Sequence, residues 1–404
     1  MLIKKHIWIV NEYAGTPLYG MDYRNYYFAK EFVNRGCNVS IIGSSYSHLF
    51  RKYPMKKREN IDGIDFFWIK TFNYGESHSY KRVVKWFLFT FKLFFLSFVI
   101  KKPDVIIVSP MAPLSIFPLW IFSKLYKAKL VYEVKDIWPL TLVELKNLSE
   151  RNPLVILLSI CEKFAIKKSD IIVSNLKNYG QYLKNILNVN KPFIWISNGI
   201  DLQEIQNTEV LPDFIKNQIP KDKFTIGYTG TVGFANALDI FCEAAKLVSN
   251  DEDKLFIIVG QGQERNNLQN KYSNLKNLLF IDSIDKKQIQ SMLALFDVCY
   301  IGLKKENLFK YGVSPNKLFE YMYSAKPILY AIESGKNNLI DIANCGICIE
   351  AENPRVIVDS IDKLYNMSEN KRKFMGDNGK EYVLKYLTYE KLAQEYIDQV
   401  VNKI

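Results

Sequence analysis

Histidine is scarce in this sequence, which has only three among its 404 residues: His6, His48 and His78. None lies in a motif that carries chemistry, so we expect no catalytic triad built on histidine. Cysteine is sparse as well: most of the six cysteines sit inside apolar runs, as buried reduced thiols do. Cys345 and Cys348 form a C-x-x-C without a second pair nearby, which favours a core position over a metal or redox site.

We expect no secretory signal, and the sequence contains neither a zinc-finger spacing nor an uninterrupted run of about 20 apolar residues. The nearest approach is the aromatic stretch 81–102, which Lys85 and Lys92 interrupt and basic residues flank. This pattern fits a helix lying in a membrane interface, and it fits equally a packing helix of an α/β layer. With a formal charge of +12, we expect a nucleotide and an anionic membrane surface as partners, and no nucleic acid. We expect the protein in the cytoplasm, on the inner face of the membrane.

Apolar strands and amphipathic helices alternate along the chain in two successive sets. The loop after the first strand lacks G-x-G-x-x-G, so NAD binding is not supported. We predict an α/β protein of two Rossmann-like domains, because 404 residues exceed one ordinary core. The predicted domains are 1–200 and 223–385, joined by a polar linker at 201–222, and a helix in 386–404 is expected to pack back onto the first domain.

One short stretch, Tyr-Gly-Val-Ser-Pro-Asn-Lys-Leu-Phe-Glu-Tyr-Met at 311–322, combines a helix start with charged groups. Ser314 and Pro315 suit an N-cap and a first helical residue, so the positive end of the helix would follow a glycine-containing loop. Lys317 and Glu320 are three residues apart and share one helix face. Together they can hold a phosphate and two sugar hydroxyls, or they are only a solvated ion pair.

Two further motifs accompany this stretch: Gly-Tyr-Thr-Gly-Thr-Val-Gly at 227–233 and Lys-Asp-Ile-Trp-Pro at 135–139. In this order the three motifs resemble the retaining, nucleotide-sugar-dependent glycosyltransferases of family four, in the branch that builds bacterial O-antigen and capsule. The resemblance spans nearly the whole chain. It implies the GT-B architecture, with two facing Rossmann-like domains and the active site in the cleft between them.

The resemblance also implies an activity: transfer of a sugar, amino-deoxy sugars included, from a UDP-linked donor to a lipid-linked saccharide. No cofactor and no essential metal are expected. The residue roles that it implies fall into three groups. They are catalysis by Asp136, Lys317 and Glu320; donor binding by Gly230, Thr231, Gly233, Gly262, Arg265, Asp282, Ile284, Ser314 and Asn316; and acceptor binding by Tyr19, Gly20, Met21 and Arg24.

The sequence departs from the family pattern at two points. Gly312 stands where the family has the first carboxylate of its Glu-x7-Glu pair, and no basic residue occurs between 225 and 245. Lys317, Arg265 or the Lys304–Lys305 pair must then neutralise the diphosphate. These departures leave two alternatives open: a non-catalytic sugar-nucleotide or polysaccharide-binding subunit, and a nucleotide-sugar epimerase. Asp251 and Asp253 match a metal-binding Asp-x-Asp but fall in a charged turn, so a solvated loop is favoured over a metal site.

Overall fold

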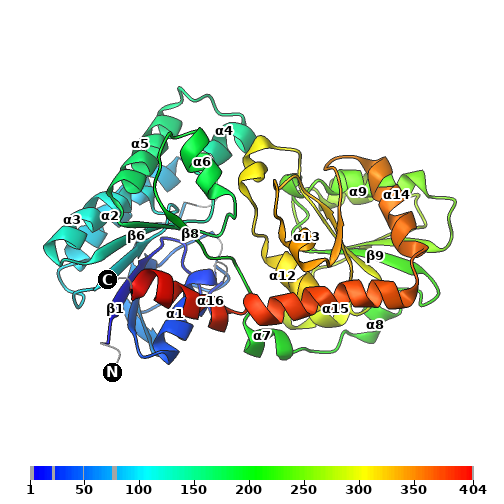
Figure 1. The fold of residues 1–404 in the computed structure, drawn as a ribbon, viewed down its shortest axis with the longest axis horizontal. Coiled ribbons are helices and arrows are strands. Elements are labelled where there is room, and N and C mark those ends of the chain that lie inside the picture. Colours follow the sequence, from blue (N-terminus) through cyan, green and yellow to red (C-terminus); the bar gives the residue numbers. More distant parts are fainter. Residues whose placement is uncertain (1–3, 21–22, 49, 75–79, 403–404) are drawn as a thin grey trace. The chain divides into compact units, whose positions relative to one another are not determined.

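The computed structural model describes residues 4–20, 23–48, 50–74 and 80–402. It divides into two compact units, Met1–Ser197 with Tyr389–Ile404 and Asn198–Thr388 (Figure 1). Each unit is built on its own sheet of mainly parallel strands, which confirms the predicted α/β class. Residues 201–222, which the sequence suggested as a linker, form two short helices and are counted with the C-terminal unit.

The sheet of the N-terminal unit has eight strands in the order β3-β4-β2-β1-β5-β6-β7-β8. Among the named strands of the described residues, β3 and β4 pair in antiparallel fashion and the other neighbours are parallel. β1 and β5 are buried along their whole length, as expected for a parallel sheet covered on both faces. The strands are β1 His6–Val10, β2 Asn38–Ser44, β3 Arg58–Ile61, β4 Ile64–Ile69, β5 Val105–Val108, β6 Lys129–Val134, β7 Ile171–Ser174 and β8 Phe193–Trp195.

Helices cover both faces of this sheet (Figure 1). On one face α2, α3 and α5 pack together through aromatic rings, for example Phe94 on Phe122 and Phe117 on Phe164. The stretch expected to be helical from 81 to 102 ends its helix at Leu96. The helices are α1 Arg24–Asn34, α2 Lys81–Leu96, η1 Pro113–Ser115, α3 Ile116–Leu125, α4 Leu140–Lys146, α5 Pro153–Lys168 and α6 Tyr179–Asn185.

The end of the chain belongs to the N-terminal unit. α16 (Tyr389–Tyr396) and the π-helical turn η5 (Ile397–Val401) lie against α1 (Figure 1). Tyr389 stacks on Tyr27 with ring centres 4.8 Å apart, and Tyr396 meets Phe28 at 5.5 Å. Residues more than 350 positions apart thus share one aromatic core.

The sheet of the C-terminal unit has six parallel strands in the order β11-β10-β9-β12-β13-β14. Its strands are β9 Phe224–Thr229, β10 Lys254–Val259, β11 Leu278–Ile281, β12 Val298–Gly302, β13 Ile328–Ala331 and β14 Gly346–Cys348. Its helices are α7 Leu202–Gln206, α8 Asp213–Lys216, η2 Phe234–Asn236, α9 Leu238–Leu247, α10 Arg265–Lys271, η3 Lys286–Gln288, α11 Ile289–Leu293, η4 Asn307–Tyr311, α12 Asn316–Tyr323, α13 Leu339–Ala343, α14 Pro354–Tyr365 and α15 Glu369–Tyr386.

Candidate functional site

Glycine turns of the C-terminal unit meet at one edge of its sheet. β9, β10 and β11 are parallel neighbours, so their carboxyl ends lie together. Gly230 and Gly260 have φ angles of +136° and +146°, and a Cβ on Gly260 would lie 1.9 Å from the Gly230 carbonyl oxygen. A Cβ on Gly262 would meet the Val232 carbonyl oxygen at 2.2 Å. Because glycine occupies these positions, the β9 and β10 turns pack backbone against backbone and present peptide groups at the sheet edge.

α12 begins at the same edge, but one residue later than the sequence predicted. Pro315 is extended (φ −70°, ψ 130°) and occupies the N-cap position, so the assignment of Ser314 as N-cap is wrong. The Ser314 hydroxyl instead accepts a hydrogen bond from the Asn198 backbone N–H at 3.2 Å. The Asn198 side chain donates to the Ser314 carbonyl and to Asn316 Oδ1. Asn198 thereby fixes the loop before α12, and the N-cap residue Pro315 makes no side-chain hydrogen bond to the first turn.

Lys317 extends from the first turn of α12 to the β9 turn. Its Nζ lies 2.5 Å from the Tyr228 hydroxyl and 3.9 Å from the centre of the Tyr228 ring. Asn236 Oδ1 is 3.5 Å away, and a Cβ on Gly230 would come within 2.9 Å of the same nitrogen. No carboxylate of the described residues forms an ion pair with Lys317.

Burial lowers the pKa of Lys317 to about 7, and the Glu320 carboxylate offsets only part of this effect. Removal from water disfavours an ammonium ion, and here no paired acid restores it. A bound anion at this position would favour the charged lysine.

Two of the other candidate cations, Lys304 and Lys305, are neutralised by the protein itself. Lys304 lies 3.3 Å from Asp239 and 3.1 Å from Glu352. Lys305 forms ion pairs with two carboxylates, those of Glu333 and Glu350, each at 3.0 Å. These carboxylates already satisfy both lysines, which leaves Lys317 as the strongest candidate and Arg265, paired with one carboxylate, as the next.

Arg265, at the start of α10, is buried and pairs with Asp282 at 2.8 Å. Gln261 donates a hydrogen bond to the same carboxylate oxygen at 2.9 Å. The Arg265 Nε is buried, and none of the residues in the described ranges accepts a hydrogen bond from it. Asp282 follows β11 and is largely exposed, with half-buried Ile284 two residues further on. Arg265 and Asp282 therefore lie at the same sheet edge as the β9 turn, after the neighbouring strands β10 and β11.

Glu320 lies one turn further along α12 than Lys317. Burial raises its pKa, Lys286 and Lys317 oppose the shift, and the charge of Glu204 adds to it. No described residue donates a hydrogen bond to the carboxylate; Gln290 donates to the backbone carbonyl of Glu320 at 3.1 Å. A carboxylate without a protein donor is available to accept hydrogen bonds from ligand hydroxyls.

Of the remaining predicted donor-binding residues, Thr231 is exposed and Gly233 half-buried in the β9 turn, and Asn316 is exposed at the start of α12. The structure thus brings the predicted residues of the C-terminal half to one sheet edge. Sequence reasoning missed Tyr228 and Asn236. Tyr228 lies within the quoted Gly-Tyr-Thr-Gly motif, but nothing local shows that its hydroxyl meets a lysine 89 positions away.

The predicted residues of the N-terminal half belong to the other unit. Asp136 is exposed in the loop after β6, and its role stays a prediction. The Tyr19 hydroxyl donates to the Glu59 carboxylate, and burial with this neighbour raises the Tyr19 pKa to about 12. Gly20 (φ +142°) forms bridge pairs with Thr16 of the same loop and with Phe50, and Met21 lies outside the described residues. Acceptor binding by this loop is likewise untested.

Arg24 is 4% exposed and pairs with Glu133 at 3.2 Å. It also donates to the carbonyls of Ile196 and Ser197. These contacts favour a structural role for its guanidinium, and acceptor binding would require them to break.

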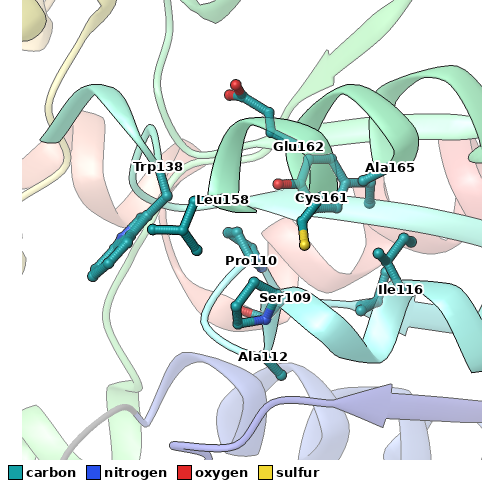
Figure 2. Close-up of a pocket in the computed structure, with 12 residues that line it drawn as sticks. Ser109, Pro110, Ala112, Ile116, Trp138, Leu158, Cys161, Glu162 and Ala165 are labelled. Carbon is teal, nitrogen blue, oxygen red and sulfur yellow. The ribbon is translucent and has the colours of Figure 1, made fainter. Parts of the chain in front are cut away.

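A small cavity lies at the carboxyl end of β5 in the N-terminal unit (Figure 2). Trp138 stands at one end of its lining and Ile116 at the other. Its volume of about 10 Å³ has room for one water molecule and no larger ligand. Glu162 lines it, accepts hydrogen bonds from the Tyr182 hydroxyl at 3.1 Å, and has its pKa raised to about 8 by burial.

Two sequence-family models match successive parts of the chain. "Glycosyltransferase Family 4" matches residues 19–204, and "Glycosyl transferases group 1" matches residues 211–382. An uncharacterised glycosyltransferase of Methanocaldococcus jannaschii is 23% identical over 250 residues, which are 59% of this chain and 61% of that protein. A second from the same organism is 24% identical over 227 residues, 55% of this chain and 57% of that protein. The chain therefore spans about three fifths of the length of these curated relatives.

Solved structures resemble the whole chain. Sucrose-phosphate synthase from Thermosynechococcus elongatus aligns over 99% of this chain and 98% of its own, with a TM-score of 0.73 and 13% identity. Anabaena HepE, solved with UDP and glucose, aligns over 99% and 100% with a TM-score of 0.67 and 13% identity. WaaG, a glycosyltransferase involved in lipopolysaccharide biosynthesis, aligns over 98% and 99% with a TM-score of 0.67 and 15% identity.

At these identities the likeness is one of fold, and the fold is the two-domain GT-B architecture. The two family models, each over less than half of the chain, show that its N-terminal part is similar to glycosyltransferases of family 4 and its C-terminal part to those of group 1.

Within the described ranges, none of the helices combines the length and the hydrophobicity that crossing a bilayer requires. The same residues contain no group of three or more His, Cys, Asp or Glu side chains placed to hold a metal ion. Asp251, the first residue of the Asp-x-Asp sequence, forms an ion pair with Lys254 at 2.5 Å.

Proposed function

We propose that this protein transfers a sugar from a nucleoside diphosphate donor, UDP-linked as in the HepE complex, to a lipid-linked saccharide. The observation that carries the proposal is Lys317, a half-buried lysine beside the Gly230 turn that forms no ion pair with an acid of the described residues. Glu320 on the same helix face would accept the ribose hydroxyls, and Arg265 and Asp282 would lie near the base and phosphates. Ile284 would lie near the base with Asp282. The donor diphosphate would be lined by the turn residues Gly230, Thr231, Gly233 and Gly262 and by Ser314 and Asn316 at the start of α12.

The chemistry follows from where charge develops. When the bond between the anomeric carbon and the diphosphate breaks, negative charge builds up on the leaving phosphate. The Lys317 ammonium and the peptide N–H groups at the start of α12 would stabilise this charge more strongly in the transition state than in the ground state. We propose transfer with retention, in which the acceptor hydroxyl attacks from the face of the leaving group and passes its proton to the leaving phosphate. No enzyme nucleophile and no metal ion are then required, and Asp136 would contact the donor sugar.

The direct test of the donor site is a thermal-shift screen with UDP-glucose, UDP-N-acetylglucosamine and GDP-mannose. A donor present at 100 times its dissociation constant should add about 2.7 kcal/mol of stability. Glu320→Ala should bind about tenfold more weakly, as should a 2′,3′-dideoxyribose analogue on wild-type protein, so either change should cut the added stability to about 1.4 kcal/mol. If no nucleotide shifts the midpoint, or if Glu320→Ala responds like wild type, the proposed donor site is wrong.

The acceptor side of the proposal rests on α2. Val84, Phe87, Phe91 and Phe95 recur on one side of this helix, and each is 51–63% exposed. Exposed apolar residues of neighbouring α3 and α5 extend the same layer: Ile121, Leu125, Ile156 and Ile160. Several exposed lysines lie on these helices and on the segments beside them: Lys81, Lys101, Lys102, Lys124, Lys163 and Lys167.

An apolar aromatic stripe with flanking lysines suits the headgroup region of an anionic bilayer. We therefore propose peripheral binding to the inner face of the cytoplasmic membrane, where a lipid-linked acceptor of surface-polysaccharide assembly, such as O-antigen or capsule, would be presented.

Flotation with vesicles containing phosphatidylglycerol tests this surface. Phe87→Ser/Phe91→Ser should reduce the bound fraction at least tenfold, whereas Phe374→Ser, at a similarly exposed position of α15, should leave it unchanged. Equal binding by wild type and the double variant would contradict the membrane proposal. Formation of a glycosylated lipid by purified protein would separate the transferase from a binding subunit or an epimerase.

A further inference from the structure

Tyr228 links the lysine to the glycine turn. The residue lies in β9, is 0% exposed, and packs in the hydrophobic core of the C-terminal unit. Its hydroxyl donates a hydrogen bond to the Thr231 carbonyl oxygen at 2.7 Å. Because the hydroxyl proton is used in the bond to Thr231, the hydroxyl oxygen acts as the acceptor for Lys317 Nζ, which lies 2.5 Å away. The hydroxyl therefore joins the β9 turn to the α12 lysine.

The Tyr228 ring adds a second constraint. Lys317 Nζ lies 3.9 Å from the ring centre, within the range of a cation–π interaction. A lysine side chain has a flexible four-carbon stem, and no carboxylate of the described residues anchors this one. The other neighbours are Asn236 on η2, at a long 3.5 Å, and Glu320 on α12 itself. Tyr228 is thus the main group that sets where the ammonium stands.

We propose that Tyr228 is a positioning residue for donor binding, whose ring and hydroxyl hold the Lys317 ammonium beside the Gly230 turn. This inference rests on the proposed function, because it assumes that the donor diphosphate binds there. Tyr228 itself need not touch the donor; it acts through Lys317.

A dependence on pH follows from this arrangement. Burial lowers the pKa of Lys317 to about 7, while the hydroxyl that accepts from the ammonium favours its charged form. Glu320 also favours the charged form, and Lys286 and Glu204 act on Glu320 rather than directly on the lysine. Donor affinity should therefore fall as pH rises above 7, because more of the empty sites hold a neutral lysine. The midpoint should move to lower pH in Tyr228→Phe, which lacks the accepting oxygen.

The first measurement needs no donor. The pKa of Lys317 is followed by NMR of the lysine side chains, with the resonance assigned by its absence in Lys317→Met. We expect Tyr228→Phe to lower that pKa by about half a unit or more. Tyr300→Phe is the matched control, because Tyr300 is a buried tyrosine of the neighbouring strand that stacks on Phe241. An unchanged pKa in Tyr228→Phe would overturn the proposed contact.

The second measurement is a double-mutant cycle on the dissociation constants of UDP-glucose, UDP-N-acetylglucosamine and GDP-mannose. Their diphosphates are esterified at both ends and do not titrate near neutral pH, so the protein alone sets the pH profile. We expect binding about tenfold weaker in Tyr228→Phe and about 100-fold weaker in Lys317→Met, with the double variant no weaker than Lys317→Met.

An equal loss from Tyr228→Phe in both backgrounds would show a merely structural role and refute the inference. If none of the three nucleotide sugars binds wild type, the proposed donor fails, whereas the NMR titration still decides the Tyr228–Lys317 contact.

Discussion

The two sheets of this protein use lysine in opposite ways at their carboxyl edges. In the N-terminal unit, Glu12 follows β1 and pairs with Lys85 of α2 at 2.9 Å, and both side chains are 0% exposed. Lys85 also donates to the Tyr46 carbonyl at 2.7 Å. In the C-terminal unit, Lys317 lies beside glycine turns and, among the residues that the structure describes, pairs with no acid. A lysine that the protein neutralises holds the fold together, whereas a lysine that it leaves unneutralised is available to a ligand.

Lys85→Met should have the largest effect, because it leaves the Glu12 carboxylate buried without its partner. Removing one member of a buried ion pair costs about 3–5 kcal/mol. Urea unfolding should show this loss in the free energy of unfolding. Glu12→Gln/Lys85→Met should recover part of it, since no charge then remains buried. A loss below about 1 kcal/mol in the single variant would remove the contrast between the two lysines.

Lys317→Met should change donor binding and leave the fold intact. We expect the dissociation constant of the donor to rise about 100-fold, because a charge-assisted contact to the diphosphate is lost. Lys304→Met is the comparison: its lysine is paired with Asp239 and Glu352, so donor affinity should change less than about threefold. Calorimetric titration measures both constants. If Lys304→Met lost more donor affinity than Lys317→Met, Lys304 would be the lysine that binds the diphosphate.

Glu162 tests a third arrangement, a buried acid of the N-terminal unit for which no ion pair is seen among the described residues. Burial raises its pKa to about 8 from 4.5, so between these pH values the folded chain keeps a proton that the unfolded chain has lost. The stabilising contribution is therefore complete below pH 4.5 and disappears as pH rises through 8.

Wild-type protein should lose about 4 kcal/mol more stability than Glu162→Gln between pH 5 and pH 9. Urea midpoints of both proteins at the two pH values check this. Parallel pH profiles would show that Glu162 is ionised in the folded protein.

Substitution of Ala325 should have the smallest effect on stability, and it should stabilise the protein where the other substitutions destabilise it or weaken binding. It follows α12 with φ +56°, a left-handed conformation that favours glycine. Ala325→Gly should raise the free energy of unfolding by about 0.5–1 kcal/mol without altering donor affinity. Thermal unfolding measures the gain, with Ala325→Ser as a control that should show none. A loss of stability in the glycine variant would mean that the entropy of the unfolded chain outweighs the relieved strain.

Much of the fold was readable from local pattern. Continuous apolar runs predicted the parallel strands, for example Val105–Val108, and their order along the chain predicted two α/β domains. The i, i+3 spacing of Lys317 and Glu320 placed both on α12, where the structure has them. The N-cap was wrong because Asn198, 116 positions away, occupies the Ser314 hydroxyl. A local capping rule does not include such a partner.

The sequence by itself determined the elements, the glycine turns and the charges available near them, because these depend on backbone preferences and on spacing within one helix or turn. The tertiary structure alone decided which charges are neutralised. Lys85 meets Glu12 across 73 positions, Lys304 meets Asp239 across 65, and Lys317 meets the Tyr228 hydroxyl across 89. Folding decides which distant side chains come next to a lysine, and therefore whether the protein neutralises it or leaves it for a ligand. No local sequence pattern contains that information.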